Sequence, residues 1–413
     1  MSKENKVNEN HHEIVVVGGG SVGMLMALAL ARLNRQIILI EKLATSQINK
    51  GDDRSIALSY SSVCILNSLG VWCKIKEYVE FIKQVHTSDK GHYGQVNLYA
   101  KDEGVAFLGV VIKIKHLFPV LYQLLMEQSN ITLYQNCQVL DLFEDKKSFR
   151  LVIKDNAPVK ITADLIIAAD GSQSKLRAKA SIIASEHDYK QSALVFDLYL
   201  QKNHESIAYE RFINNGVLAL LPAAQKKMAC VWTVDCDMVE HWDQKDKSSI
   251  LKEIQRLMGY RLGRFLGIST LKSFPLSLIQ AQVLYRKNLL LFGNASHFLH
   301  PVLGQGLNLS IRDIGVLYDL LAAKGSFSPQ SVQTVLDKYQ ETRACDHKRT
   351  ALLTHSIIDI FAHSSLPVRF VRGAGIYHLE RDQHLKKVFS KLLMGNYNHG
   401  STLIRTKSGK DKL

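Results

Sequence analysis

The stretch IVVVGGGSVGMLMALALARL, residues 14–33, decides the fold. Ile14–Val17 is a β-branched run typical of a buried strand, a glycine-rich turn follows at once, and Met24–Leu33 continues as an apolar helix. A second strand, Gln36–Ile40, ends in a carboxylate. This order is the dinucleotide-binding fingerprint, in which glycines admit the pyrophosphate, the helix N-terminus receives it, and an acid about 20 residues on holds the ribose. The residues expected in these roles are Gly18, Gly20, Ser21, Gly23 and Glu41. Glu41 disfavours a 2′-phosphate, which favours FAD or NAD over NADP.

A second strand–loop–helix pattern runs from Leu289 to Leu321. A short apolar run ends at Gly293, and the helical spacing of leucines resumes after an irregular loop. Gly304–Gln305–Gly306 therefore lies just before a helix N-terminus, where backbone N–H groups are unpaired and the macrodipole is positive. Two glycines separated by one residue admit a flat ligand, and reduced flavin is a flat ring that becomes anionic. Taken alone, the pattern fits an ordinary connection equally well.

A third stretch, Asp164–Arg177, contains a buried strand that closes at Asp170–Gly171. Together the three stretches resemble the FAD-dependent aromatic hydroxylases of the para-hydroxybenzoate hydroxylase type. In that family the Asp-Gly segment lies beside the cofactor pyrophosphate and the nicotinamide path. The last motif of the family corresponds to Gly293–Asn308 here.

The resemblance is more specific to the ubiquinone-biosynthesis hydroxylases, in particular to the branch that acts on 2-polyprenyl-6-methoxyphenol. It covers residues 13–361. Four stretches carry it: DRSIAL at 53–58, VHTSDKGHYG at 85–94, ERF at 210–212 with Leu221–Pro222, and GNASHFLHPVLGQGLNLSIRD at 293–313.

The resemblance implies roles for individual residues of these motifs. Arg54 would reach the FAD pyrophosphate, Asn294 would accept a ribityl hydroxyl, and Pro301 would pack against the flavin ring. The backbone of Gly304, Gln305 and Gly306 would stabilise the anionic flavin together with the helix dipole. The resemblance assigns cofactor binding also to Asp170, Gly171, Gly306, Leu307 and Asn308. His297 and His300 border the same loop, but each has an ordinary structural explanation.

Two positions depart from the family pattern. Asn294 stands where most aromatic hydroxylases have Asp; an amide oxygen can still accept a hydrogen bond, and the methoxyphenol branch is similar in having Asn. Near His116–Val120 the family usually offers Gln or Arg toward the flavin. Pro119 and Val120 cannot supply that contact.

These patterns predict an α/β fold with a Rossmann-like FAD-binding domain, an inserted mixed β-sheet substrate domain and C-terminal helices. Alternating patterns interrupt the FAD domain, and a pocket between the two domains would receive a small substrate. The expected boundaries are 13–84, 99–180 and 281–345 for the FAD-binding domain, 85–98 and 181–280 for the substrate sheet, 346–400 for the helical region, and 1–12 and 401–413 for disordered tails. A loop and helix are expected around Arg54–Leu69, and separate helices over Val332–His347 and Leu352–Phe361.

Composition limits the remaining choices. The 413 residues suffice for two domains, and no run approaches the roughly 18 apolar residues of a membrane span. Six cysteines without a C-x-x-C pair fit neither a zinc site nor a redox motif and suit reduced thiols in a core. The polar first dozen residues lack a signal core, so a cytoplasmic protein is expected, with a peripheral contact to the inner face of the membrane as an open alternative.

The net charge of +14 bears on partners. The basic residues are not interleaved with aromatics and no nucleic-acid motif is present, so a negatively charged membrane surface is a better partner for them than nucleic acid. Arg381–Met394 forms a basic amphipathic pattern. Such a helix lies on a membrane, holds a partner, or, more often, docks on its own domain.

The expected activity is that of an NAD(P)H- and O2-dependent FAD monooxygenase that hydroxylates a prenylated phenol in ubiquinone biosynthesis, without a metal site. Other ubiquinone-biosynthesis enzymes are its expected protein partners. One alternative is a flavin-dependent reductase of the geranylgeranyl-reductase kind, which shares the fingerprints. The other is a non-catalytic FAD-binding subunit of a ubiquinone-synthesis complex. Substrate-dependent oxygen consumption that yields an oxygenated product distinguishes the hydroxylase from both.

Overall fold

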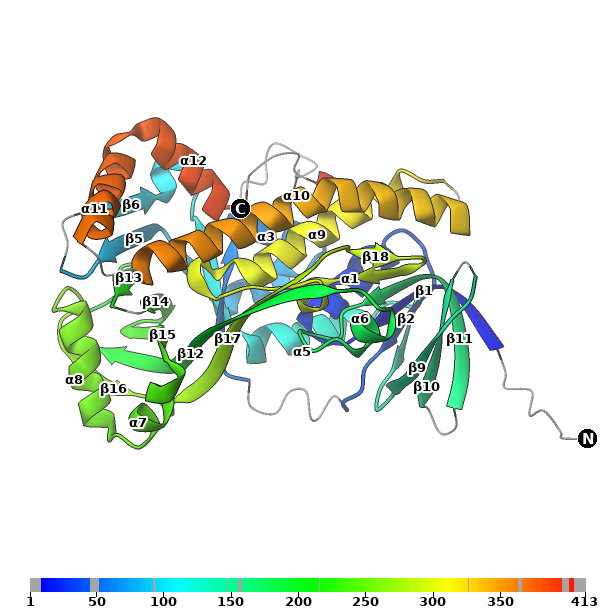
Figure 1. Cartoon of the computed structure of the whole chain (residues 1–413), viewed down its shortest axis with the longest axis horizontal. Helices are drawn as coiled ribbons and strands as arrows, with labels where there is room; N and C mark the ends of the chain where they lie inside the picture. The colour runs from blue at the N-terminus through cyan, green and yellow to red at the C-terminus, as the bar shows by residue number, and fades with distance from the viewer. Residues whose placement is uncertain are drawn as a thin grey trace, which may run out of the picture.

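An eight-stranded sheet is built around the fingerprint strand in the computed structural model (Figure 1). The structure describes residues 9–44, 52–91, 94–146, 148–154, 158–214, 216–325, 327–362, 366–395 and 401–404. The strands of this sheet are β1 (Glu9–Val17), β2 (Ile37–Ile40), β8 (Ile131–Tyr134), β9 (Gln138–Glu144), β10 (Phe149–Lys154), β11 (Pro158–Ala168), β18 (Tyr285–Arg286) and β19 (Leu289–Leu291). β1 lies between β11 and β2 and is parallel to both, and parallel pairing continues to β8 and β19.

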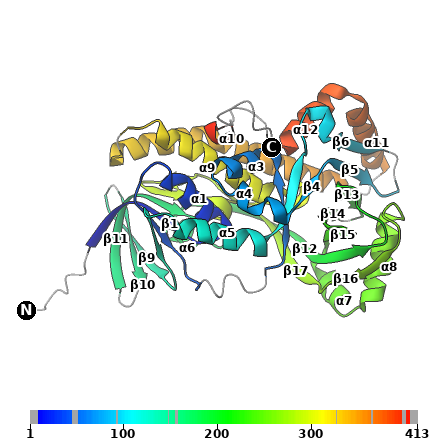
Figure 2. The same cartoon turned by 180° about the vertical axis from the view of Figure 1, so that it is seen from behind.

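The parallel strands are covered on both faces, which explains their continuous apolar sequences. Val16 faces a core shared with the helices α1 (Ser21–Ala31), α5 (Ile114–Met126) and α9 (Gln305–Ala322). Val15 faces a second core with strand β10 and the short helix α6 (Lys175–Lys179). Figure 2 shows α1 and α5 side by side on the helical face.

A second, nine-stranded sheet forms the inserted domain. Its strands are β5 (Gln84–Asp89), β6 (Gln95–Tyr99), β12 (Ala184–Leu200), β13 (Ile207–Ile213), β14 (Gly216–Ala224), β15 (Lys227–Asp235), β16 (Phe265–Ile268), β17 (Lys272–Ala281) and β20 (His297–Phe298). The sheet is mixed because β13 pairs in parallel with β5, whereas the other strand pairs, such as β13–β14 and β12–β15, are antiparallel. Leu194 and Phe196 of β12 point to a core under α8 (Lys247–Met258), near α7 (Val239–Asp243). The predicted fold class is confirmed.

A small third sheet was not predicted. Its strands are β3 (Ser55–Ser59), β4 (Val79–Ile82) and β7 (Gly109–Lys113), with β7 in the middle. The sequence around Arg54–Leu69 suggested a loop and a helix, but β3 precedes α3 (Tyr60–Ser68) and α4 (Trp72–Ile75). Five residues are enough for a strand here because the antiparallel partner β7 satisfies their backbone groups.

The C-terminal region is helical. The stretches expected as two helices form one, α10 (Pro329–Ala362), which crosses both domains at the top of Figure 1. Its far end packs on the second sheet, where Ile358 shares a cluster with Phe212 and Val302. The basic segment forms most of α12 (Gln383–Leu393), which follows α11 (Leu366–Arg381) and packs beside β6 through Met394. No helix in the described ranges is long and apolar enough to cross a membrane.

Parts of both segments that were expected as disordered tails are placed in the structure. β1 already starts at Glu9, because residues 9–12 continue the pairing with β11. Ser401–Ile404 are also placed: the Ser401 hydroxyl donates to the Gly315 carbonyl and Leu403 is buried. Residues 1–8 and 405–413 lie outside the described residues. None of the six cysteines, all of which lie in the described residues, forms a disulfide bond. Only Cys64, Cys137 and Cys230 are buried, so the core explanation fails for the other three.

Candidate active site

A cavity of about 1090 Å³ lies between the two large sheets. Its walls come from the fingerprint turn, the loop before α9 and one face of the second sheet. The sequence-predicted site residues that line it are Gly20, Ser21, Gly23, Arg54, Gly171, Asn294, Pro301, Gly304, Gln305, Gly306, Leu307 and Asn308. Gly18, Glu41 and Asp170 lie outside this lining.

Two helix N-termini open onto the cavity. α1 begins after Gly20, α9 begins after Gly304, and neither N-cap residue makes a side-chain hydrogen bond. Their first N–H groups are thus available to an anion, and the dipoles favour one. α9 starts two residues earlier than expected: Gly304 is its N-cap, in the left-handed region at φ +59°, and Gln305 and Gly306 are already helical. A Cβ added at Gly20 or Gly306 would meet no atom within 4 Å, so both backbones are open to a ligand.

Gly18 and Gly23 serve the turn itself. Gly18 has φ +110°, and an added Cβ would lie 2.3 Å from the Ala169 carbonyl oxygen. At Gly23 an added Cβ would lie 1.8 Å from the Gly18 carbonyl oxygen. These glycines allow strand, turn and helix to pack closely and so position the N-terminus of α1.

Glu41 ends β2 as expected, but its carboxylate is buried against the turn. Oε2 accepts a hydrogen bond from the Gly19 N–H at 2.5 Å, and Oε1 accepts one from the Leu43 N–H at 2.8 Å. Each carboxylate oxygen has a second lone pair, which leaves acceptor capacity for ribose hydroxyls.

Asp170 and Gly171 follow β11 at the edge of the cavity. Asp170 Oδ2 accepts from the Leu176 N–H at 3.3 Å, whereas Oδ1 is buried without a hydrogen-bond partner. A Cβ added at Gly171 would meet open space. A buried acceptor without a partner beside an open backbone fits a ligand that brings hydroxyl donors.

Arg54 and Asn294 both line the cavity. The Arg54 guanidinium is held by Asp52, with Nε 2.8 Å from Oδ1 and Nη2 2.6 Å from Oδ2, and it stacks on Phe274 at 4.9 Å. Asn294 and Pro301 are exposed to the cavity. They can contact a bound group without any rearrangement of the core.

Asn308 and Gln305 turn their side chains toward the protein. Asn308 Oδ1 accepts from the Ser59 N–H at 2.8 Å and the Ser62 hydroxyl at 2.7 Å, and Nδ2 donates to the Ala57 and Gly304 carbonyls. Its amide is thereby fully used in joining α9 to β3 and α3. Gln305 Nε2 donates to the Leu303 carbonyl at 3.2 Å. For Asn308, only the backbone remains for a cofactor.

Glu210 was missed as a site residue. It lies on β13, lines the cavity, is 8% exposed and accepts a hydrogen bond from the Leu303 N–H at 3.1 Å. Burial raises the pKa of this carboxyl to about 7. The sequence held a signal, because Ala208, Glu210 and Phe212 alternate on one face of a strand, and an acid on an otherwise apolar face is unusual.

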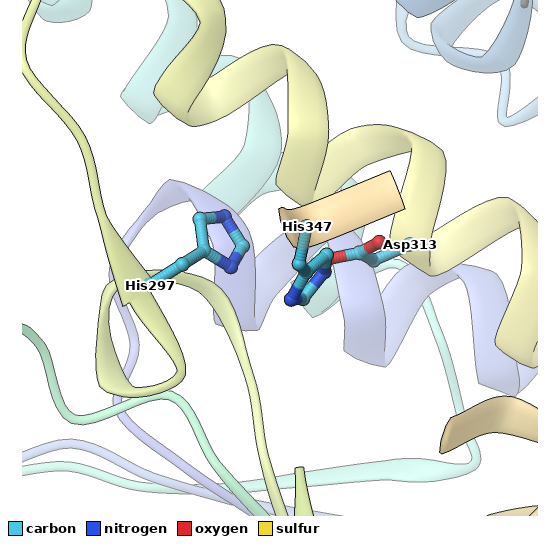
Figure 3. Close-up of side chains that lie close together, drawn as sticks. All are labelled: His297, Asp313 and His347. Atoms are coloured by element: carbon cyan, nitrogen blue, oxygen red, sulfur yellow. The ribbon is translucent and has the colours of Figure 1, made fainter. Parts of the chain in front are cut away.

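Behind α9 lies a buried polar cluster, the α9–α10 clamp, made of His297, Ser310, Asp313, Arg343 and His347. Figure 3 shows three of them, His297, Asp313 and His347. Ligand atoms of its two histidines and the aspartate lie within 4.8 Å of one another. However, Asp313 Oδ1 is 2.5 Å from Arg343 Nε, and Oδ2 is 2.8 Å from His347 Nε2. A cation already occupies the carboxylate, so the cluster suits charge pairing between α9 and α10 better than metal binding.

The cavity wall beside α12 is apolar. It is formed by residues of β4, β5, β6, the following loop and the end of α12, namely Ile82, Val85, Leu98, Leu108, Leu393 and Met394. The cavity face of the central strands carries small residues, namely Ala193, Ala208 and Ala219. The cavity therefore combines a polar end at the helix N-termini with an apolar wall that suits a hydrocarbon chain.

Comparisons with known proteins agree with this geometry. Residues 11–351 match the family model described as FAD binding domain. The chain is 27% identical over 391 residues to ubiquinone hydroxylase UbiL of Rhodospirillum rubrum, covering 94% of this chain and 90% of that protein. It is also 27% identical to 3-demethoxyubiquinol 3-hydroxylase of Escherichia coli, covering 93% and 98%. The p-nitrophenol 4-monooxygenase PnpA from Pseudomonas putida shares the fold, with a TM-score of 0.76 at 16% identity, covering 97% of this chain and 100% of that chain.

Proposed function

The chain belongs to the FAD-binding-domain family, and we propose that it uses this cofactor to hydroxylate a polyprenylated phenol in ubiquinone biosynthesis. It is an FAD-dependent monooxygenase with NAD(P)H as electron donor and O2 as oxidant. Named hydroxylases of ubiquinone biosynthesis match more than nine-tenths of the chain, which supports the substrate class. The observation that carries the proposal is the cavity, where two helix N-termini meet a largely apolar wall.

The residues present fit FAD. The open backbone at Gly20 and the N-terminus of α1 would hold the pyrophosphate, and Glu41 would hold the ribose. Asp170 Oδ1, buried without a partner, and Asn294 would accept hydroxyls of the cofactor. When bound, FAD supplies the exchange of electrons with NAD(P)H and the activation of O2. The backbone of Gly304–Gly306 and the positive end of α9 would stabilise negative charge on the ring, and Pro301 would pack against its face.

The substrate would occupy the rest of the cavity. Its phenol would lie near the start of α9, where water is excluded by the second sheet. Its prenyl chain would follow the apolar wall toward Leu393 and Met394 at the end of α12. This arrangement brings the ring close to the cofactor and leaves the length of the chain free to vary.

Access to a membrane lipid would come through α12. Leu385 and Val388 are exposed, and so are the cations Lys387 and Lys391 of the same helix. Anionic headgroups attract such cations while the apolar side chains insert. Lys386 differs from them, because it pairs with Glu380 at 3.1 Å. A ubiquinone-biosynthesis partner that presents the lipid would use the same surface.

The test of the cofactor begins with the purified protein, which should be yellow and release FAD on denaturation. Gly20→Trp should abolish FAD binding, because the indole would fill the place of the pyrophosphate. Gly325→Trp is the matched control, since its Cβ also meets open space but far from the cavity lining. A colourless protein that cannot be reconstituted with FAD would overturn the proposal.

The reaction is tested by oxygen consumption with a short-chain prenylphenol and NADH or NADPH, followed by mass spectrometry of the product. A hydroxylase consumes O2 in step with a product heavier by one oxygen atom. Reduction of a double bond without oxygen uptake would identify a reductase, and bound FAD without turnover would identify a non-catalytic subunit.

The membrane contact is tested by vesicle flotation. Changing Lys387 and Lys391 to Glu should reduce binding to vesicles that contain phosphatidylglycerol and slow turnover of a long-chain substrate, with FAD content unchanged. Lys386→Glu breaks a contact within the protein and is the control for helix docking. Unchanged vesicle binding by the double variant would assign delivery of the lipid to a protein partner.

A further inference from the structure

Glu210 is placed in the cavity by the alternation of its strand. On β13, Tyr209 packs into the core under α8, while Ala208 and Glu210 lie on the opposite face of the strand; all three residues contribute to the cavity lining. Four carboxylates line this cavity in the part of the chain that the structure describes: Asp52, Glu186, Asp188 and Glu210. Glu210 alone among them is buried.

The carboxylate has spare capacity to accept hydrogen bonds. Its contact with the Leu303 N–H, at 3.1 Å, uses one of about four lone-pair positions. Leu303 belongs to the turn directly before α9 and has φ +62°, a left-handed conformation that a leucine rarely adopts. Glu210 therefore holds this strained turn with one oxygen and leaves further positions for a donor in the cavity.

The environment brings the pKa of this carboxyl close to neutral pH, so that it can exchange a proton there. The pKa of Glu210 is raised to about 7 by burial, and the hydrogen bond from Leu303 opposes the rise. Strand neighbours opposite it are Thr87 and Ala219, neither of which carries a charge. Arg211 points to the other face, where it donates to Ser88.

Titratable groups on the other packed elements do not change this result. They are His300 before α9, Tyr189 on β12, and His355 and Asp359 on α10. His300 and Tyr189 lie edge to face, and His355 pairs with Asp359 at 3.4 Å. None of the four contributes to the pKa shift of Glu210, which follows from burial and the Leu303 N–H alone.

We propose that Glu210 is a catalytic residue that accepts the phenolic hydroxyl of the substrate as a hydrogen-bond donor and takes its proton. The inference rests on the proposed hydroxylase function. In the step, the phenol O–H bond breaks, a carboxyl O–H bond forms, and the oxygen keeps the electron pair as a phenolate. The phenolate donates electron density to the ring, which makes the carbon beside it a better nucleophile toward electrophilic oxygen. A base with a pKa near the working pH is effective in such a transfer.

The same contact would fix the orientation of the ring. Since Glu210 also holds Leu303, a phenol bound to it lies next to the turn that leads into Gly304 and α9. The Glu210 side chain would then set the charge of the phenol, the position of the phenol and the position of the turn beside the cofactor. A purely structural Glu210 would hold the turn but would not interact with the substrate.

The test is Glu210→Gln in the FAD-loaded protein. The amide oxygen can still accept from the Leu303 N–H, so FAD content should be unchanged, but the base is lost. Product formation should fall by about 100-fold or more, in the range of general base catalysis. The rise of the wild-type rate through about pH 7 should disappear. Glu240→Gln, an exposed carboxylate on α7, is the matched control and should leave rate and pH profile unchanged.

A substrate series separates catalysis from structure. Ring-fluorinated phenols that are already ionised at pH 8 need no base, so they should restore most of the lost rate in Glu210→Gln and flatten the wild-type pH profile. A structural role predicts the same loss with every phenol. An unchanged rate and pH profile in Glu210→Gln, or equal loss with ionised and neutral phenols, would overturn the inference. Absence of oxygen uptake by the wild type would instead overturn the proposed function.

Discussion

A buried carboxylate lies on each side of α9, and the two differ in the charges that surround them. Asp313, behind the helix, pairs with Arg343 and His347, and the positive charges around it hold the pKa of its carboxyl well below the ordinary value despite burial. Glu210, which reaches the turn before the helix from the cavity side, has one neutral N–H donor and a pKa raised to about 7. Burial is common to both, so pairing decides which carboxylate stays ionised and which exchanges a proton.

The difference distinguishes residues that stabilise the fold from residues that can bind ligands or exchange a proton. The α9–α10 clamp fixes the helix whose N-terminus faces the cavity, and its donors and acceptors are used within the protein. Burial lowers the pKa of His297 to about 3, which keeps that ring neutral and inert at physiological pH. On the cavity side, Glu210, Asn294 and Asp170 Oδ1 retain free acceptor capacity. Substitutions behind α9 should therefore change stability, and substitutions in front of it should change binding and turnover.

The largest effect is expected for Asp313→Asn. The amide cannot balance the buried charge of Arg343, and loss of one partner of a buried pair costs about 3–5 kcal/mol. Asp346, 2.5 Å from Arg343 Nη2, retains part of the pairing and places the cost at the lower end of this range. Thermal unfolding of the FAD-free protein should show a marked drop in Tm.

The pH dependence of this first effect is a further check. A carboxyl whose folded-state pKa is depressed contributes stability above its unfolded pKa and loses it as pH falls through the folded value. The difference between wild type and Asp313→Asn should therefore be constant from pH 5 to 8. A difference that changes across this range would show that Asp313 or a group paired with it titrates, and that the clamp is not a fixed charge pair.

An effect of opposite sign is expected for the stability of Glu210→Gln. Between the ordinary value of 4.5 and the folded value of about 7, folded Glu210 binds a proton that the unfolded chain lacks, so wild-type stability falls as pH rises from 5 to 8. The full difference corresponds to about 3 kcal/mol. The stability of Glu210→Gln does not fall in this way, because the amide does not titrate. The variant should therefore be more stable than wild type at pH 8 and similar to it at pH 5. Urea unfolding at both pH values measures this; a variant less stable at pH 8 would show that the ionised carboxylate stabilises the fold.

Sequence patterns predicted the cavity side of α9 better than the side behind it. The fingerprint turn and Gly304–Gly306 were found because glycine spacing and strand–helix order are local signals. Asn308 shows the limit: its family motif suggested a cofactor contact, but its amide is used by Ser59 and Ser62, which lie far away in the chain. β3 was missed because its stability comes from pairing with β7. The clamp could not be predicted from the sequence either, because Asp313 and His347 come into contact only when α9 and α10 pack together.

A smaller effect in front of the helix is expected for Asn294→Leu. If Asn294 accepts a cofactor hydroxyl, leucine leaves that hydroxyl unpaired and weakens FAD binding by about 1–3 kcal/mol. Asn294→Asp keeps an acceptor and is the matched control, which should stay active. Titration of the FAD-free protein with FAD measures both affinities, and the Tm of the FAD-free protein should not change. Wild-type affinity in the leucine variant would exclude the contact.

The smallest effect is expected behind the helix, for Ser310→Ala. The Ser310 hydroxyl lies 3.3 Å from His297 Nε2 and donates to the Gly306 carbonyl at 3.2 Å. Alanine removes the partner of a buried ring nitrogen, at a cost of about 1–3 kcal/mol, but it is the better helix former by several tenths of a kcal/mol and does not compete for the backbone. The two contributions should leave a net loss of stability of about 1 kcal/mol. FAD affinity should not change, because Gly306 presents its open side to the cavity whether or not its carbonyl is bonded from behind. Equal losses of stability and FAD affinity would mean that the clamp also tunes the N-terminus of α9, and the division between the two sides of the helix would then fail.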